Sequence, residues 1–304
     1  MRRALVLLAA ALAACSEPPP PRPNVLLITI DTLRADRLGC YGNADWGASP
    51  SPRIDALAAQ GVQFSSLFAP RGQTHPSLAA MLTGKYPITT GLRENGLDLL
   101  PHHRTLLQRL ASAGWRTGAF VANFGLDDEG DAWVFRGADA RGDGYQGRFR
   151  QEAGAREARF QRAWDERVES AALDFLKRQD GARPFAAWVH FYDVHRPYNP
   201  PPGFDRYGHA DGLPEVLRAP GADDGPALDA HIDGITLSDR PGPDAELRRI
   251  LGLYDGSVTA TDERVGRLLD ALEASGLAGN TVVILSADHG EELFDRNRYF
   301  YHGN

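Results

Sequence analysis

Cysteine is scarce in this chain, which limits how the fold can be held together. Only two of the 304 residues are cysteines, Cys15 and Cys40. Cys15 directly follows an N-terminal leader and is expected to carry lipid, so we expect no intramolecular disulfide in the folded domain. Long basic runs are also lacking and the formal net charge is −7, which argues against nucleic acid as a partner.

The N-terminus has the pattern of a secretory leader. Arg2 and Arg3 precede an apolar run over residues 4–14, which is too short to span a bilayer. The run ends in Leu-Ala-Ala-Cys15 and resembles a bacterial lipobox, whose cysteine becomes the lipidated first residue of the mature protein. An ordinary signal peptide with a chance cysteine is the alternative.

From this leader we predict a signal peptide over residues 1–14 and a proline-rich, extended tether over 15–22. Residues 23–304 then form the folded domain. The predicted location is the bacterial cell envelope, with the protein attached to a membrane through lipid on Cys15, periplasmic or outer-membrane-associated.

Two apolar runs, far apart in the chain, each end at an acidic residue. Residues 24–30 are followed by Asp31, and residues 281–287 by Asp288 and His289. Short β-branched runs of this kind are typical of strands buried on both faces of a parallel sheet. Ligands collect beyond the carboxyl ends of such strands, so neighbouring strands would bring the three side chains together. Two carboxylates and an imidazole favour a divalent cation site.

Strands alternate with helices along the chain, which predicts an α/β fold with a doubly wound, mostly parallel sheet and helices on both faces. Residues 125–151 are expected to be a surface excursion, 199–243 a long loop, and Gly256 a helix irregularity. The other predicted strands cover residues 62–64, 117–121 and 185–191, and the predicted helices cover 52–60, 76–83, 105–113, 152–177 and 244–275.

Thr74 lies where the helix over residues 76–83 would begin, because Pro76 suits the first turn of a helix. Free N–H groups and the helix dipole make that end an anion site. A hydroxyl there, beside a divalent cation, can lose its proton and attack phosphorus or sulfur. The alternative is that Thr74 is only a helix N-cap.

Taken together, these segments resemble the sulfatase family of the alkaline-phosphatase superfamily. The resemblance extends from about Pro23 to the end of the chain. Six segments carry it: Pro-Asn-Val-Leu-Leu-Ile-Thr-Ile-Asp31-Thr32, Thr74-His-Pro-Ser-Leu78 with Leu-Thr-Gly-Lys85, Val189 to Tyr198, Tyr254 to Gly266, Ser-Ala-Asp288-His289-Gly-Glu291, and His302-Gly303.

The resemblance implies an alkaline-phosphatase-like fold and a metal-dependent hydrolase of sulfuric or phosphoric esters. Its metal ligands would be Asp31, Thr74, Asp288 and His289, holding one divalent ion. The family usually binds calcium; zinc or manganese also suit the histidine. The substrate would be a small-molecule, glycan or lipid ester. Because the chain stops almost on top of this site, we also expect a C-terminal subdomain to be missing.

Several positions depart from the sulfatase pattern. The family's nucleophile is a cysteine or serine oxidised to formylglycine, but here it is Thr74. Four residues after the nucleophile the family has an arginine, where this chain has Leu78. The family has a second aspartate after the first strand, where this chain has Thr32. A threonine nucleophile resembles the phosphodiesterase and phosphoethanolamine-transferase branch of the superfamily. A catalytically inactive, ligand-binding relative is a further alternative.

Two histidines are candidates for protonating the leaving group, His195 and His302. A structural role for His195 in a proline-rich turn is equally consistent with the sequence. Asp193, His195 and His302 can alternatively be interpreted as ligands of a second metal. Lys85 is expected to be a helix-end cation, and His75, His102 and His103 are expected to be solvated.

Overall fold

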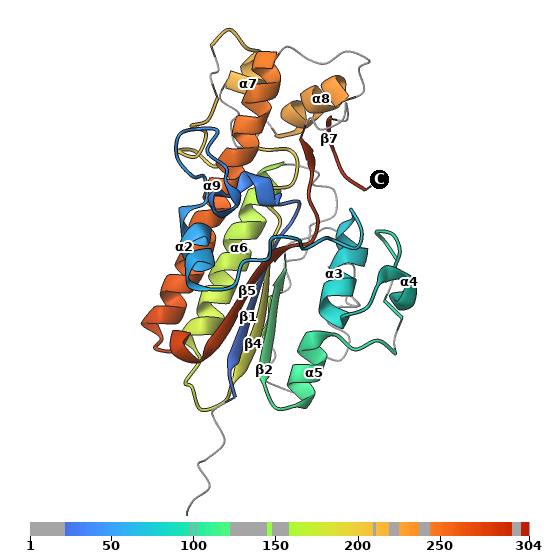
Figure 1. The fold of residues 1–304 in the computed structure, drawn as a ribbon, viewed down its shortest axis with the longest axis vertical. Coiled ribbons are helices and arrows are strands. Elements are labelled where there is room, and N and C mark those ends of the chain that lie inside the picture. The colour runs from blue at the N-terminus through green and yellow to red at the C-terminus, as the bar shows by residue number, and fades with distance from the viewer. Residues whose placement is uncertain are drawn as a thin grey trace, which may run out of the picture.

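A five-stranded parallel sheet forms the centre of the computed structural model (Figure 1). The structure describes residues 22–97, 99–100, 102–121, 145–147, 158–208, 211–218, 225–236, 244–293 and 299–303. The strand order is β3-β2-β4-β1-β5, with all pairs parallel. The strands are β1 (Asn24–Ile30), β2 (Arg116–Val121), β3 (Tyr145–Gly147), β4 (Phe185–Phe191) and β5 (Thr281–Ala287). A separate antiparallel pair joins β6 (Glu292–Leu293) to β7 (Tyr299–Tyr301).

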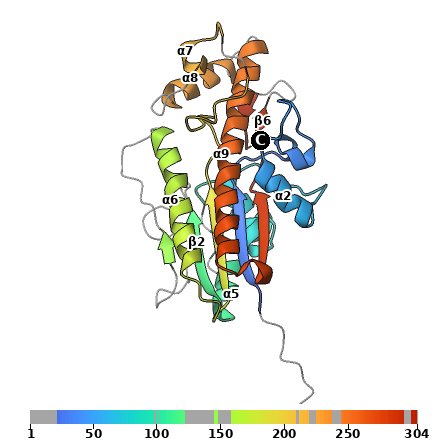
Figure 2. The same ribbon diagram turned by 90° about the vertical axis from the view of Figure 1, so that its left-hand side faces the viewer.

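Helices cover both faces of the sheet (Figures 1 and 2). One face carries α2 (Pro52–Gln60), α6 (Ala158–Lys177) and α9 (Asp244–Ala274). The other carries α3 (Thr74–Thr83), α4 (Pro87–Thr90) and α5 (Leu106–Ser112). Beyond the carboxyl ends of the strands lie α7 (Glu215–Arg218) and α8 (Gly225–Thr236). Single 3-10 turns cover Ala35–Arg37, Gly39–Tyr41 and Ala278–Asn280. No helix within these described ranges is long and apolar enough to cross a membrane.

The alternation of side chains in β1 explains why the sheet has a core on each face. Leu26, Ile28 and Ile30 belong to the larger apolar cluster, which also holds residues of α6 and α9. Leu27 belongs to the second cluster, which includes Leu78 of α3. Because successive strand residues point to opposite faces, a continuous apolar run is what a strand covered on both faces requires.

The fold predicted from the sequence is confirmed in its main features. The strands over residues 24–30, 185–191 and 281–287 have the predicted bounds, and β1 pairs directly with β5, with Ile30 opposite Ala287. Helix α9 begins at the predicted residue and ends one residue before the predicted end. Helices α3 and α5 begin or end within two residues of their predicted bounds.

Some local predictions were wrong. The strand over residues 281–287 is not buried on both faces: β5 is the outer strand of the sheet, and Val282 and Ile284 are 48% and 42% exposed. Residues 62–64 form no strand, and the segment 199–243 contains α7 and α8. The expected excursion at 125–151 includes β3, whose three residues pair with β2; the rest of that segment lies outside the described residues. The leader and tether at 1–21 and the start of the helix predicted over 152–177 also lie outside them.

Gly256 does not interrupt α9, which is continuous from Asp244 to Ala274. It permits a close approach instead: a Cβ there would lie 2.6 Å from the Phe204 carbonyl oxygen and 3.0 Å from Pro200 Cγ. We expect Gly256→Ala to lower the free energy of unfolding by about 1–3 kcal/mol, measured by urea denaturation. Gly234→Ala in α8, where a Cβ meets nothing within 4 Å, should be neutral or stabilising by up to about 1 kcal/mol. Equal effects of the two changes would contradict this explanation.

Asp262 of α9 joins this helix to the start of α2. Its carboxylate accepts the backbone N–H groups of Arg53 at 3.0 Å and Ile54 at 2.8 Å. Burial raises the pKa of Asp262 to about 6, although the two N–H donors oppose the shift. Since its folded pKa lies above its unfolded value of 3.8, protonation favours the folded state.

The contribution of Asp262 to stability should therefore be largest at low pH and fall as the pH rises from about 4 to about 6. We expect Asp262→Asn to gain stability relative to the wild type across that interval, by about 3 kcal/mol at most. Urea denaturation of both proteins at intervals between pH 4 and pH 7 measures this difference. A difference that does not change with pH would refute the assignment.

Candidate metal and ester site

Two carboxylates meet at the carboxyl edge of the sheet because β1 and β5 are parallel neighbours. Asp31 and Asp288 directly follow these strands, and both are buried. Asp288 Oδ1 accepts the backbone N–H of His289 at 2.7 Å and that of Thr32 at 3.2 Å. Asp288 Oδ2 makes no hydrogen bond to any residue that the structure describes. One oxygen thus orients the carboxylate and the other is available for a ligand.

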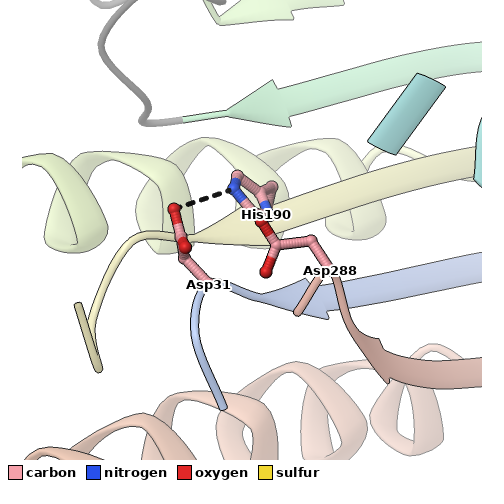
Figure 3. Close-up of side chains that lie close together, drawn as sticks. All are labelled: Asp31, His190 and Asp288. Atoms are coloured by element: carbon pink, nitrogen blue, oxygen red, sulfur yellow. Dashed lines mark ion pairs between the residues drawn. The ribbon is translucent and has the colours of Figure 1, made fainter. Parts of the chain in front are cut away.

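His190 joins these carboxylates from the end of β4 (Figure 3). Its Nδ1 lies 2.8 Å from Thr29 Oγ1, which also accepts the indole N–H of Trp188 at 2.9 Å. Its Nε2 lies 3.9 Å from Asp31 Oδ2 and has no hydrogen bond within the described part of the chain. Burial lowers the pKa of His190 to about 4. The ring is therefore neutral at neutral pH, which is the form that binds metals.

Asp31, His190 and Asp288 place one ligand atom each within 4.8 Å of one another. All three are fully or almost fully buried. Since buried carboxylates are normally hydrogen-bonded or bound to metal, Asp288 Oδ2 and His190 Nε2 fit a cation at this point. Within the described ranges this is the one grouping of three such side chains. Asp193, His195 and His302 form no such group, so the alternative of a second metal gains no support.

Thr74 approaches the group of Asp31, His190 and Asp288 from α3, the helix on the sheet face opposite α6 and α9. It is the first residue of α3, whose other end is closed by Gly84 in the left-handed conformation. The Ser77 hydroxyl donates to the backbone carbonyl of Asp288 and ties the helix to β5. Thr74 Oγ1 consequently lies 3.2 Å from Nε2 of His289.

The tautomer of His289 follows from its second contact. His289 Nδ1 lies 2.9 Å from the Gly290 carbonyl oxygen, which can only accept, so Nδ1 carries the proton. The lone pair of Nε2 then faces the Thr74 hydroxyl and lies 3.5 Å from Asp288 Oδ2 and 3.7 Å from Asp31 Oδ1. All four metal ligands expected from the sequence, namely Asp31, Thr74, Asp288 and His289, are therefore brought together.

His302 and His195 extend this site outward in a row of rings. The ring centroids of His289 and His302 are 4.8 Å apart, and those of His302 and His195 are 5.1 Å apart. His302 Nδ1 donates to Glu291 Oε1 at 3.1 Å. Burial opposes a charge on His302, but Glu291 outweighs it and the pKa of His302 is raised. Burial lowers the pKa of His195 to about 4, and its Nδ1 donates to the Arg196 carbonyl at 2.7 Å.

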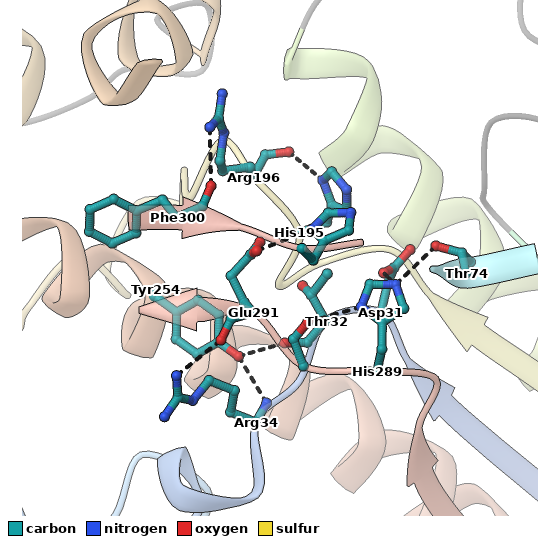
Figure 4. Close-up of polar contacts among 12 residues, drawn as sticks. Asp31, Thr32, Arg34, Thr74, His195, Arg196, Tyr254, His289, Glu291 and Phe300 are labelled. Carbon is teal, nitrogen blue, oxygen red and sulfur yellow. Dashed lines mark hydrogen bonds and ion pairs between the residues drawn. The ribbon is translucent and has the colours of Figure 1, made fainter. Parts of the chain in front are cut away.

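Thr32 holds the loop after β1 in place, although it has lost the carboxylate of the family pattern. Its φ of 54° is in the left-handed region, which a β-branched residue seldom adopts. The Tyr254 hydroxyl donates to the Thr32 carbonyl at 2.8 Å and accepts the Arg34 N–H at 3.0 Å (Figure 4). This conformation directs the Thr32 N–H toward Asp288.

The sequence did not single out His190 as a ligand, and two other predictions about histidines were wrong. A histidine inside a run that is otherwise apolar and buried on both faces was the available signal. His75 and His103 are buried rather than solvated, at 4% and 5% exposed. His103 Nδ1 lies 3.0 Å from Lys85 Nζ, so the Lys85 ammonium is partnered there. Leu78 is fully buried in the core and supplies no cation.

Comparison with known proteins first defines the fold. The phosphonate monoester hydrolase of Agrobacterium radiobacter superposes with a TM-score of 0.65 at 22% identity, covering 93% of this chain and 65% of that one. The parallel sheet with helices on both faces is thus of the alkaline-phosphatase-like type found in sulfatases.

The sulfatase family model matches residues 23–304, and the chain belongs to the sulfatase family. Human iduronate 2-sulfatase is 28% identical over 317 residues, covering 92% of this chain and 57% of that protein. An arylsulfatase of Clostridium perfringens is 26% identical, covering 91% of this chain and 64% of that protein. The chain thus spans less than two thirds of the length of these relatives.

Proposed function

We propose that this protein is a metal-dependent hydrolase of sulfate or phosphate esters that uses Thr74 as its nucleophile. The observation that carries the proposal is the position of Thr74 Oγ1, 3.2 Å from His289 Nε2 and beside the buried group of Asp31, His190 and Asp288. A hydroxyl at a helix N-terminus, next to potential metal ligands, has the arrangement needed for attack on an anionic ester.

Asp31, Asp288, His289 and His190 would hold the cation. A divalent ion there would lower the pKa of the Thr74 hydroxyl and offset the negative charge of the ester. Thr74 Oγ1 would give up its proton to solvent and attack in line, forming its bond to phosphorus or sulfur as the bond to the leaving oxygen breaks. The N–H groups at the start of α3 stabilise the charge on the remaining oxygens. In a second displacement, water attacks the same phosphorus or sulfur and loses a proton, while the bond to Thr74 Oγ1 breaks and that oxygen takes up a proton.

The leaving oxygen needs a proton, and we assign that role to His302 rather than His195. The raised pKa of His302 keeps its ring protonated to higher pH than usual, with Nδ1 held by Glu291. With its pKa lowered to about 4, His195 is neutral at neutral pH. Its Nδ1–H donates a hydrogen bond to the Arg196 carbonyl. It therefore serves better as an acceptor for the substrate or for attacking water.

Phosphate esters suit a threonine nucleophile better than sulfate esters do. Oxidation of threonine would give a ketone instead of the formylglycine aldehyde, so the elimination that releases sulfate in sulfatases is not open to Thr74. A phosphorylated threonine is released by water. A phosphodiesterase or phosphotransferase is consequently the second candidate, and it shares all the residues above.

The proposed cation is zinc or manganese, with calcium as the alternative implied by the family. His190 adds a second imidazole to the ligands expected from the sequence. Calcium prefers six to eight oxygen ligands, whereas imidazole nitrogen suits zinc, and the two carboxylates suit manganese. Calorimetric titration with each ion would rank them.

A panel of esters tests the proposed activity. The purified protein is incubated with p-nitrophenyl sulfate, p-nitrophenyl phosphate and bis-p-nitrophenyl phosphate, with and without EDTA. We expect turnover of at least one phosphate ester that EDTA abolishes and added zinc or manganese restores. Metal binding without turnover of any ester would favour an inactive, ligand-binding relative. Preferred turnover of the sulfate would overturn the phosphate assignment.

We also propose that Cys15 carries a lipid anchor and that the protein is located in the bacterial cell envelope. Both proposals are supported by the lipobox resemblance at residues 12–15. Labelling with a radioactive fatty acid in wild type and Cys15→Ala would test them, since only the wild type should incorporate label. The substrate class that we propose is a small-molecule, glycan or lipid ester.

A further inference from the structure

Arg196 connects three segments around the outer histidines. It follows His195 directly, and its side chain is 14% exposed. Nε donates to Asp229 Oδ1 at 2.8 Å and Nη2 to Asp233 Oδ1 at 2.5 Å. Nη1 donates to the backbone carbonyl of Phe300 at 3.2 Å (Figure 4). The guanidinium thus links the loop after β4 to α8 and to β7.

The contact with Phe300 matters because of where this residue stands. Phe300 lies two residues before His302 and is 1% exposed. Its φ is 54°, a left-handed conformation that a bulky residue rarely adopts unless its surroundings hold it there. The ring packs against Tyr198 at 5.8 Å between centroids. The ring contact and the Arg196 hydrogen bond together hold the backbone that leads into His302.

The two aspartates on α8 orient the Arg196 guanidinium toward the Phe300 carbonyl. Asp229 and Asp233 are four residues apart in one helix, so their side chains lie on the same face. A planar guanidinium directs separate N–H groups at two such carboxylates in a fixed geometry, which the ammonium of a lysine lacks. With Nε and Nη2 so engaged, Nη1 is directed at the Phe300 carbonyl.

We infer that Arg196 is a positioning residue that sets the place of His302 relative to Thr74. The inference rests on the proposed function, in which His302 protonates the leaving oxygen. Arg196 acts through β7 and touches neither the metal ligands nor Thr74 in the described contacts. Its loss should therefore weaken proton donation while the cation site remains intact.

Leaving-group dependence provides the test. Arg196→Met is compared with wild type on p-nitrophenyl esters, whose leaving group needs little protonation, and on alkyl esters of the same acid, which need it. We expect kcat for the alkyl esters to fall about 10- to 100-fold, as for a displaced catalytic group. For the p-nitrophenyl esters it should fall less than about 3-fold, and KM and metal affinity should change little for both.

The control is Arg53→Met, which removes another ion-paired arginine, the partner of Asp270. It should leave both classes of ester unaffected. An equal fall of Arg196→Met on both classes, or no fall on either, would overturn the inference. Should Arg196→Met fail to fold, the double change of Asp229 and Asp233 to Asn removes the charged partners from the exposed side of the contact and should give the same pattern.

A second measurement separates this inference from the proposed function. In 15N-histidine spectra, Arg196→Met should shift the ring signals of His302 and leave those of the buried His190 in place. Unmoved His302 signals would refute the inference whether or not the protein turns over any ester. If the wild type turns over no ester but His302 shifts in Arg196→Met and also in the double Asn variant, which keeps the Arg196 charge, the proposed activity fails and the positioning contact stands.

Discussion

Thr74→Ala is expected to lower kcat for ester hydrolysis by at least about 1000-fold, because no other group in the site takes over covalent catalysis. Thr74→Ser keeps a hydroxyl at the same helix N-terminus and should retain turnover within about 10-fold. Steady-state rates on the best ester of the panel measure both changes. Thr83→Ala is the matched control in the same helix: its hydroxyl bonds the Ala79 carbonyl at 2.6 Å, far from the catalytic group, and its loss should leave kcat unchanged.

The covalent step makes the Thr74 prediction sharper. With a slow phosphate ester, rapid acid quenching and mass spectrometry should find the protein heavier by one phosphoryl group, on the peptide containing Thr74. Thr74→Ala should show no such adduct. Full activity in Thr74→Ala, or an adduct on another residue, would rule out this nucleophile.

Asp288→Asn is expected to weaken cation binding by at least about 100-fold and to lower turnover by at least about 1000-fold. Asparagine can keep its carbonyl oxygen on the N–H groups of Thr32 and His289. It replaces the other oxygen and the negative charge with an amide NH2, which cannot bind a cation. The loop geometry should thus survive while the site loses a ligand.

Calorimetric titration with zinc and manganese measures this loss directly, alongside the rate. The control is Asp270→Asn, whose carboxylate is 62% exposed and pairs with Arg53 away from the site. It should bind the cation as the wild type does. Unchanged affinity in Asp288→Asn would place the cation elsewhere and remove the basis of the proposed chemistry.

Much of the candidate site was predictable from local patterns. The runs before Asp31 and Asp288 are short, continuous and apolar, which predicts strands of a parallel sheet, and they become β1 and β5 with the predicted bounds. Only β1 is covered on both faces, because β5 is the outer strand and leaves Val282 and Ile284 exposed. Parallel neighbours must end at the same edge, so the two carboxylates had to meet once the pairing was correct. The start of α3 was also predictable from the sequence, since proline is favoured in the first turn of a helix and Pro76 marks that turn.

Other residues depended on contacts that no local pattern encodes. His190 has the same sequence context as a core residue of β4, and only the register that sets it beside Thr29 turns its ring toward Asp31. The burial of His75 likewise follows from contacts with a loop some 20 residues away, where Asn95 Oδ1 accepts its N–H and Gly96 N–H donates to its Nδ1. Helix α8 escaped detection because its surroundings are rich in glycine, proline and aspartate.

The sequence by itself determined the sheet, its two apolar faces and the positions of Asp31, Thr74, Asp288 and His289, because hydrophobic periodicity and strand ends are local properties. The tertiary structure decided which further groups join them: His190 from β4, the pair of Glu291 with His302, and the arginine that holds β7. His190 contacts Thr29, 161 residues away, and Arg196 contacts Phe300, 104 residues away. Strand pairing and burial, and not the local sequence, bring such distant residues together.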